Sequence, residues 1–239
     1  LTYRGTVGIV KPSYESGTLV EFIRLLPEGI GVVPVYLGLK EHTEREYLAA
    51  LDGCKAKVGE LARIGVDLIH PEGAPPFLIR GYKAEQETVQ NWEQEYKIPI
   101  VTSAMTQTAA FRAMGMKKLF GVTFHGQRIN DMFARYFAEA GFEVVAIEEM
   151  PVDRARRQSL STEEIYSHIK KFFVRHAGAD GIYLQGSGTW RAADVLPLEQ
   201  DLGIPVIHPV AARVWYVQRH FHLRQPRKGA GLLLEHMPR

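Results

Sequence analysis

The chain has 239 residues, 46% of them hydrophobic, which is enough to bury a core in one large domain or two of ordinary size. Its 29 basic and 27 acidic side chains are spread along the whole length and give a formal net charge of +2. This balance gives no electrostatic reason to expect nucleic acid or a membrane surface as a partner, so a small molecule is the expected ligand.

Cys54 is the only cysteine and cannot form an internal disulfide, which fits a reducing compartment. No apolar run approaches the roughly 20 residues that span a bilayer. The first residues read as a strand rather than as a signal peptide. We therefore expect a cytoplasmic protein without a membrane partner.

Short β-rich runs alternate with longer helical patterns. In the first part of the chain, strands are predicted at residues 6–10, 31–36, 67–70 and 98–103, and helices at 19–26, 43–64 and 83–96. Further strands are predicted at 117–124, 143–149, 181–185 and 204–208, with helices at 129–140 and 162–177. Apolar strands that alternate with helices indicate parallel α/β sheets covered on both faces.

An internal duplication accompanies this alternation. Residues 8–12 resemble 121–125, residues 67–73 resemble 180–186, and residues 92–101 resemble 198–207. Chance similarity could explain any one pair, but three pairs in the same order predict two similar halves. We expect an α/β fold of two pseudo-symmetric, doubly wound, flavodoxin-like halves with a cleft between them, the first spanning 1–110 joined by 210–239, the second 111–209.

The carboxyl ends of the strands in such halves face the cleft, where open α/β sheets bind ligands. The residues predicted there are mainly polar or titratable: Pro12, Ser13, Tyr14, Glu15, Tyr36, Glu72, Gly73, Ala74, Ser103, His125, Gln185, Gly186, Ser187 and His208. This set predicts a small-molecule site.

Four segments, residues 7–22, 67–81, 121–142 and 184–215, resemble the aspartate/glutamate racemase superfamily, and within it the branch of maleate isomerase and arylmalonate decarboxylase. The resemblance covers nearly the whole chain. It implies a homo-oligomeric enzyme without metal or organic cofactor, an isomerase or a decarboxylase-like lyase for a small carboxylate or carbonyl compound.

The superfamily resembled here places a reactive cysteine after the third strand of one half or of both, because a thiol pKa can be brought near neutrality. The matching position in the first half of this chain is Gly73. In the second half it is Gly186 or Ser187, depending on which neighbouring segment anchors the comparison. Cys54 lies in a helical segment and is expected to be a buried core residue. The chemistry is therefore expected to proceed without the family cysteines.

Glu72, His125 and Ser187 are the residues expected to act in place of the missing cysteines. Glu72 and His125 would form an acid–base pair, with the carboxyl pKa raised by burial and the imidazole near neutrality. Ser187 would be a hydrogen-bond donor, or a nucleophile with His125 or His208 as its base. A hydrolase built on these groups is the alternative function, and a non-catalytic small-ligand binding protein is the third.

The expected substrate-binding residues are Ser13, Tyr14, Glu15, Gly73, Gly186, Gly188, Thr189, Arg191 and His208. Backbone amides of the second turn would hold an oxyanion, and Arg191 would contact a carboxylate. Six candidate residues also have a purely structural explanation. It is a helix cap for Ser187 and Glu15, an imidazole with satisfied hydrogen bonds for His125 and His208, and a solvated side chain for Arg191 and Glu72.

A metal site is not expected. Glu15, His70, Glu72, His125 and His208 could supply ligands, but no close-spaced ligand pair occurs among them, and the resemblance argues against a metal.

Overall fold

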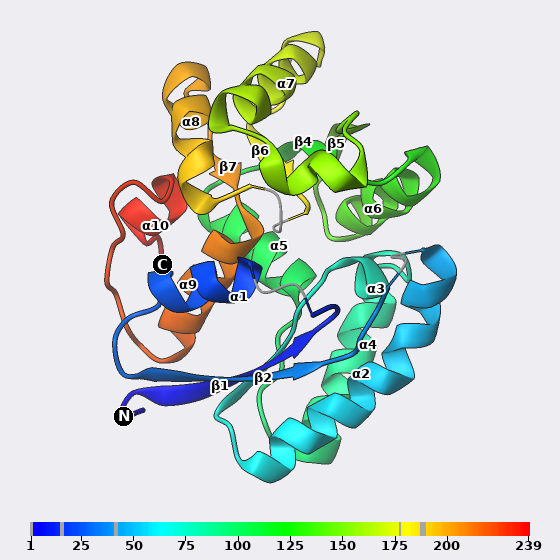
Figure 1. The fold of residues 1–239 in the computed structure, drawn as a ribbon, viewed down its shortest axis with the longest axis vertical. Helices are drawn as coiled ribbons and strands as arrows, with labels where there is room; N and C mark the ends of the chain where they lie inside the picture. Colours follow the sequence, from blue (N-terminus) through cyan, green and yellow to red (C-terminus); the bar gives the residue numbers. More distant parts are fainter. Residues whose placement is uncertain (1, 15–16, 41–42, 177, 187–189) are drawn as a thin grey trace.

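Each half of the chain contains one parallel sheet in the computed structural model, which describes residues 2–14, 17–40, 43–176, 178–186 and 190–239. In Figure 1 the sheet with β1 and β2 lies below, the sheet with β4 to β7 lies above, and α5 and α9 lie between them. Of the helices in the described ranges, none is both long and apolar enough to cross a membrane.

The first sheet has the strand order β2-β1-β3. Its strands are β1 (Gly5–Lys11), β2 (Ile30–Tyr36) and β3 (Leu68–Pro71). The predicted strand at 98–103 is reduced to a single bridge between Ile100 and Ile69. The helices of this half are α1 (Gly17–Leu25), α2 (Glu44–Ile64), α3 (Pro75–Leu78), α4 (Tyr82–Tyr96) and α5 (Ser103–Ala113).

The second sheet has the order β5-β4-β6-β7. Its strands are β4 (Lys118–Thr123), β5 (Glu143–Glu149), β6 (Gly181–Leu184) and β7 (Val206–Ile207). The helices are α6 (Gln127–Glu139), α7 (Thr162–Arg175), α8 (Leu196–Leu202), α9 (Pro209–His220) and α10 (Leu232–His236), with 3-10 turns η1 (Arg154–Ser159) and η2 (Ala192–Val195).

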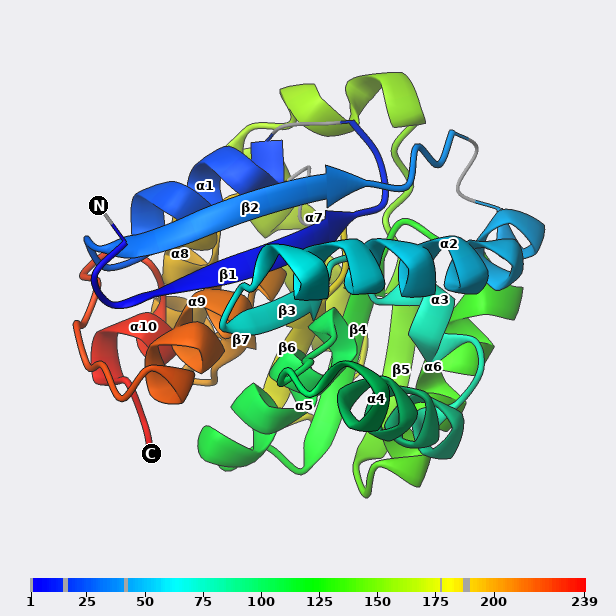
Figure 2. The same ribbon diagram turned by 90° about the horizontal axis from the view of Figure 1, so that it is seen from below.

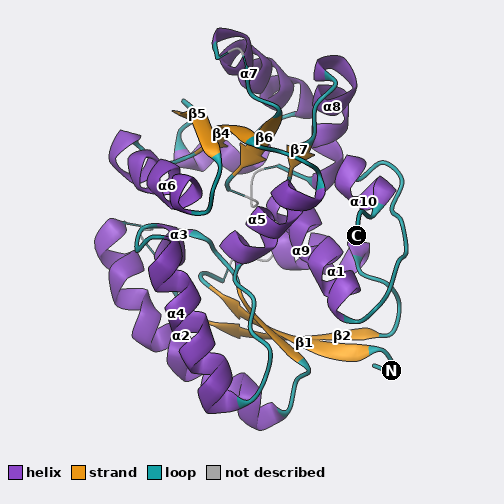
Figure 3. Cartoon of the chain, turned by 180° about the vertical axis from the view of Figure 1, so that it is seen from behind, coloured by secondary structure: helices purple, strands orange, loops and turns teal. Residues whose placement is uncertain are grey.

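The first sheet is covered on both faces, as predicted. Val7 and Ile9 of β1 share a core cluster with Phe22 of α1, while Val10 shares another with Val58 of α2. Side chains alternate between the faces of a strand, so this division follows from the sequence of β1. Figures 2 and 3 show the strands between the α2–α4 layer and the layer that holds α1 and α9.

Equivalent hydrogen bonds occur within each half. The backbone N–H of Thr6 donates to the Asp67 carboxylate at 2.7 Å, and that of Lys118 donates to Asp180 at 2.8 Å. Further along, Glu93 accepts from the N–H of Ile100 at 2.8 Å. Its counterpart, Glu199, accepts from the N–H of Val206 at 2.9 Å. The two-half α/β fold predicted from the sequence is confirmed.

One predicted alignment between the halves is wrong by a single residue. The N–H of Glu72 donates to the carbonyl of Val10, and that of Gln185 donates to the carbonyl of Val122, each at 2.9 Å. Val10 therefore corresponds to Val122, and Lys11 to Thr123, so the glycines of residues 8–12 and 121–125 do not coincide. A shared glycine misled the sequence comparison, whereas the backbone pairing sets the register.

Helices α5 and α9 were missed in the sequence. They pack against each other, and α9 also packs against α1 and α10, so both are buried on several sides. Polar side chains such as Gln107 on α5 and Arg213 on α9 are buried with them. A helix without a solvated face lacks the amphipathic period that identifies a helix in sequence. The domain boundary predicted at residue 110 falls inside α5.

Cys54 is a core residue, as predicted. Its side chain lies in the cluster under α2 and is 4% exposed. Burial raises the pKa of its thiol to about 12, so the thiol stays protonated and unreactive.

Candidate functional site

Glu72 follows β3 directly, and its carboxylate is held by side chains from three other elements. Lys11, at the end of β1, places its Nζ 3.2 and 3.3 Å from the two carboxylate oxygens. Thr18 of α1 donates to Oε1 at 2.6 Å, and Nη1 of Arg213 on α9 forms an ion pair with Oε2 at 2.8 Å. We call these four residues the Glu72 cluster.

The carboxyl group of Glu72 is ionised. Burial by itself would raise its pKa, but Arg213 and Lys11 outweigh this and, with the Thr18 hydrogen bond, lower the pKa to about 2. The expectation of a raised carboxyl pKa is therefore wrong. At neutral pH Glu72 is therefore ionised, and its carboxylate is paired with two buried cations.

Gly73 forms the turn beside this cluster. Its φ of +89° lies in the region that favours glycine, and its N–H donates to Ser103 Oγ at 3.1 Å. Ser103 Oγ also lies 3.3 Å from Nε2 of His70. Burial, followed by the charge of Arg213, lowers the pKa of His70 to about 3. His70 is thus neutral, and Ser103 connects its ring to the backbone of the turn.

The equivalent positions in the second half carry no charge. Thr123 corresponds to Lys11 and donates to Asn130 at 2.7 Å, as Lys11 donates to Thr18. Gln185 takes the place of Glu72, but its Oε1 accepts from the hydroxyl of Tyr183 at 3.0 Å.

The counterpart of Arg213 is Gln107, which lies at the same distance from its helix cap. Its Nε2 donates to the carbonyl of Leu184 at 3.2 Å, and its buried Oε1 has no partner in the described part of the chain. The second strand end therefore repeats the geometry of the first without its ions.

Gly186 forms the second turn, equivalent to that of Gly73. Its φ is +105°, and a Cβ at this position would lie 2.5 Å from the ring of Phe124. Neither a cysteine nor any other side chain fits at Gly186 without displacing this ring. Ser187, Gly188 and Thr189 lie outside the described residues, as does Glu15, so their predicted roles stay predictions.

His125 follows β4, and its ring is partly exposed. The ring meets Tyr47 of α2 edge-on, with centroids 6.0 Å apart, and Phe133 of α6 at 5.5 Å. It therefore lies where the two halves meet. His125 is not among the three residues named above that contact the Glu72 carboxylate, and the acid–base pair of Glu72 and His125 stays a prediction.

His208 caps α9 with both ring nitrogens engaged. Nδ1 accepts from the N–H of Val210 at 3.2 Å, and Nε2 donates to the carbonyl of Trp190 at 2.9 Å. Its side chain is buried, and burial lowers its pKa, which favours the neutral ring. This geometry matches the alternative of a satisfied imidazole, and a contact of His208 with substrate stays a prediction.

Arg191 is engaged within its own half. Its guanidinium pairs with Asp194 at 2.8 Å and donates to Thr162 at 2.8 Å. Tyr14 is 74% exposed and stacks on Tyr36 with ring centroids 5.3 Å apart, next to the partly buried Ser13. Contact of Arg191, Tyr14 and Ser13 with a substrate stays a prediction. Within the described ranges, no three His, Cys, Asp or Glu residues gather as metal ligands.

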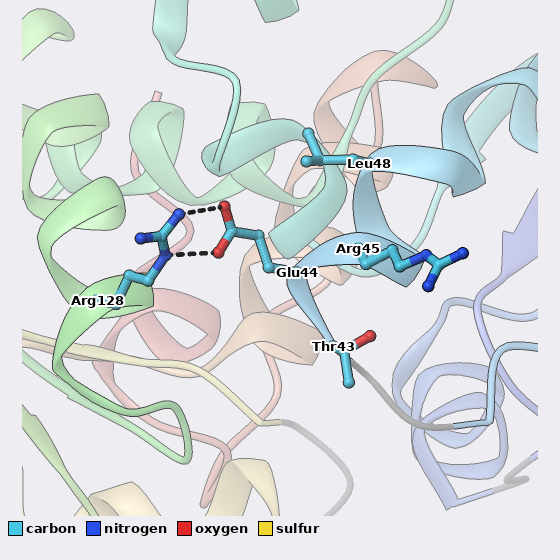
Figure 4. Close-up of a pocket in the computed structure, with 5 residues that line it drawn as sticks. All are labelled: Thr43, Glu44, Arg45, Leu48 and Arg128. Atoms are coloured by element: carbon cyan, nitrogen blue, oxygen red, sulfur yellow. Dashed lines mark hydrogen bonds and ion pairs between the residues drawn. The ribbon is translucent and has the colours of Figure 1, made fainter.

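An open surface pocket bridges the halves at a place the sequence did not indicate (Figure 4). It is lined by Thr43, Glu44, Arg45, Leu48 and Arg128. Arg128 of α6 reaches Glu44 of α2 with two contacts of 2.7 and 3.2 Å. Arg128 is largely exposed, so this ion pair is weak.

A second buried carboxyl group, Glu85 of α4, joins the halves. It accepts from Thr102 at 2.5 Å and from the hydroxyl of Tyr136 on α6. Burial raises its pKa to about 7, although both hydroxyls act to lower it. Glu85 thus titrates near neutrality, where Glu72 does not.

The same two-half fold occurs in solved structures of arylmalonate decarboxylase and of maleate isomerases. A maleate isomerase from Pseudomonas putida superimposes with a TM-score of 0.88 at 19% identity, covering 98% of this chain and 99% of that one. A maleate cis-trans isomerase from Nocardia farcinica gives a TM-score of 0.87 at 16% identity, with 97% and 98% covered.

The family model for arylmalonate decarboxylase matches residues 7–234, and the chain belongs to this family. The arylmalonate decarboxylase of Bordetella bronchiseptica is 19% identical over 211 residues, which cover 88% of each protein. The resemblance to this branch of the aspartate/glutamate racemase superfamily, inferred from the sequence, is confirmed.

Proposed function

We propose that the protein is a cofactor-independent lyase or isomerase that acts on a small carboxylic acid or carbonyl compound at the carboxyl ends of its two sheets. Family membership supports the reaction class. The observation that carries the proposal is the buried ionic cluster beside the Gly73 turn, because the equivalent strand end needs no charge to fold. Buried charges that the fold does not require mark functional sites.

The described residues suggest a division of roles. Glu72 keeps Lys11 and Arg213 in place, so that their positive potential acts at the Gly73 turn. His125 is the proposed proton carrier, because it is partly exposed between the halves and histidine ordinarily changes charge near neutral pH. Ser187 is the proposed hydrogen-bond donor of the second turn.

In a decarboxylation, the bond between the α-carbon and the leaving carboxylate breaks and carbon dioxide departs. The electron pair moves onto a carbonyl group next to the α-carbon and forms an enolate, which the positive potential stabilises. A proton from His125 then completes the product. In an isomerisation the C–H bond of the α-carbon breaks instead. His125 takes this proton, and the same enolate is then protonated at another position or on its other face.

The test is an activity panel of arylmalonates, maleate, small monocarboxylic acids, lactones and amides, followed by NMR. We expect turnover of an acid, and we expect His125→Ala to lower kcat/KM by about 10²- to 10⁴-fold. His168→Ala, on α7, is the matched control and should leave turnover unchanged.

Two outcomes would contradict the proposal. Cleavage of lactones or amides that depends on Ser187 would instead support the hydrolase. Ligands that raise the melting temperature while no product accumulates would identify a binding protein.

A further inference from the structure

The carboxylate of Glu72 is coordinated as a bound carboxylate ligand would be. An ammonium group, a hydroxyl and a guanidinium reach it from β1, α1 and α9, at distances of 2.6 to 3.3 Å. Lys11 and Arg213 are each 2% exposed, and Thr18 is 8% exposed. Charge-assisted contacts from several elements onto one buried carboxylate are the arrangement that proteins use to bind acids.

Folding of the strand ends does not require this arrangement. In the second half the same backbone is built with Thr123, Asn130, Gln185 and Gln107, and the side chain of Gln185 bonds to Tyr183 of its own strand. The second strand end therefore forms the equivalent backbone without two cations and a carboxylate.

Arg213 also has a support of its own. Its guanidinium lies over the ring of Phe22 with 4.6 Å to the centroid, so the planar group is oriented by α1 and by Glu72. A guanidinium that is already oriented keeps its geometry when one partner is exchanged for another of the same shape.

We infer that Lys11, Thr18 and Arg213 form a carboxylate-binding site that Glu72 occupies in cis, and that shortening residue 72 opens this site to a small external monocarboxylate. Glu72→Ala removes a CH₂–COO⁻ group, which has the size of acetate. The variant removes the carboxylate that Lys11 and Arg213 share, and removing one partner of a buried ion pair is strongly unfavourable. Acetate or formate removes this penalty by taking the same three contacts.

The inference has a consequence for the substrate, which rests on the proposed function. Arylmalonate and maleate, the compounds after which the relatives are named, are dicarboxylic acids. In this chain Glu72 already takes the contacts of Lys11, Thr18 and Arg213 next to Gly73, so a second carboxylate of a substrate cannot take them. The wild-type substrate therefore carries a single carboxylate, and Glu72→Ala shifts binding towards dicarboxylic acids.

Chemical rescue tests the site without any need for turnover. Melting temperatures of wild type, Glu72→Ala and Gln185→Ala are measured in sodium acetate, sodium formate and sodium chloride at equal ionic strength. We expect Glu72→Ala to melt well below wild type, and acetate to raise its melting temperature by on the order of 5 °C in a saturable manner. Chloride should not reproduce the rise, and Gln185→Ala, at the equivalent position, should not respond to acetate.

Equal responses to acetate and chloride, or an equal acetate response in Gln185→Ala, would overturn the inference. If Glu72→Ala does not survive purification, its refolding yield from urea in acetate and in chloride replaces the melting curve, and equal yields again count against it. Lys11→Met combined with Glu72→Ala should abolish the rescue.

Substrate selectivity is read separately, from melting shifts of wild type and Glu72→Ala with propionate and with succinate. A preference of wild type for succinate contradicts the single-carboxylate substrate. Acetate rescue in a protein that turns over no acid would leave the site standing while the proposed function fails, so the two are distinguishable.

Discussion

The ends of β3 and β6 have the same backbone hydrogen bonding and differ in their side chains. Glu72 and Gln185 donate equivalent backbone hydrogen bonds of 2.9 Å, and each is followed by a glycine with positive φ. The first end nevertheless holds three charged groups and the second holds neutral ones. The two halves therefore share the backbone arrangement at this strand end, and of the two described strand ends the first carries the ionic site.

The largest expected effect comes from removing one charge from the first end. Arg213→Met should lower the free energy of unfolding by about 3–5 kcal/mol, because it leaves Glu72 without its closest buried cation. Gln107→Met, at the equivalent place, should cost about 1 kcal/mol, since one neutral hydrogen bond is lost. Urea unfolding measures both, and similar losses would show that the ion pair does not distinguish the halves.

The two glycine turns provide the next test. Gly186→Ala should cost about 2–4 kcal/mol, because an added Cβ strains a positive φ and meets Phe124. Gly73→Ala should cost less, about 1–2 kcal/mol, because the nearest atom, in Pro12, lies 3.2 Å away. Gly178→Ala, with φ +102° and open space around it, isolates the backbone strain. A larger loss at Gly73 than at Gly186 would reverse this order.

Glu85 and Glu72 are both buried, but their pKa values are shifted in opposite directions. The pKa of Glu85 in the folded state, about 7, lies above its unfolded value of 4.5. Its contribution to stability is therefore complete below pH 4.5 and is lost as the pH rises towards and through 7. Glu85→Gln keeps an acceptor for the hydroxyls and cannot ionise, so it should remove about 2–3 kcal/mol of this decline between pH 5 and 8.

The pKa of Glu72 is lowered to about 2, so its contribution is present above pH 4.5 and is lost only as the pH falls towards 2. Unfolding curves of wild type and Glu85→Gln from pH 3 to 8 separate the two groups. Parallel pH profiles for the two proteins would mean that Glu85 does not titrate in this range.

The smallest effect is expected at the surface contact between the halves. Glu44→Ala should leave stability unchanged within the error of urea unfolding, because the Arg128 side chain is 77% exposed and the pair is screened by water. A clear loss would show that this exposed pair holds the halves together.

Much of the fold could be predicted from the sequence, because apolar strands and amphipathic helices leave periodic patterns. The duplication was visible for the same reason, in the segments around Asp67 and Asp180. Helices α5 and α9 were not predicted, since they are buried between the sheets and carry buried polar residues such as Gln107. A shared glycine suggested the wrong register for β1 and β4, and only backbone hydrogen bonds show the correct one.

The strand-end position of Glu72 was predicted, but the charged groups around it were not. Glu72 and Gly73 were expected at the end of a strand and lie there. The partners that set the pKa of Glu72 could not be predicted, because Arg213 is distant in sequence and lies on a helix without a recognisable pattern.

By itself the sequence determined two α/β halves, their glycine turns and the absence of cysteine from those turns, because local patterns and residue identity decide these features. Tertiary structure alone decided that Lys11, Thr18 and Arg213 converge on Glu72 and keep it ionised. Electrostatic energy depends on the distance between charged groups and on their burial, and the separation of residues along the sequence gives neither.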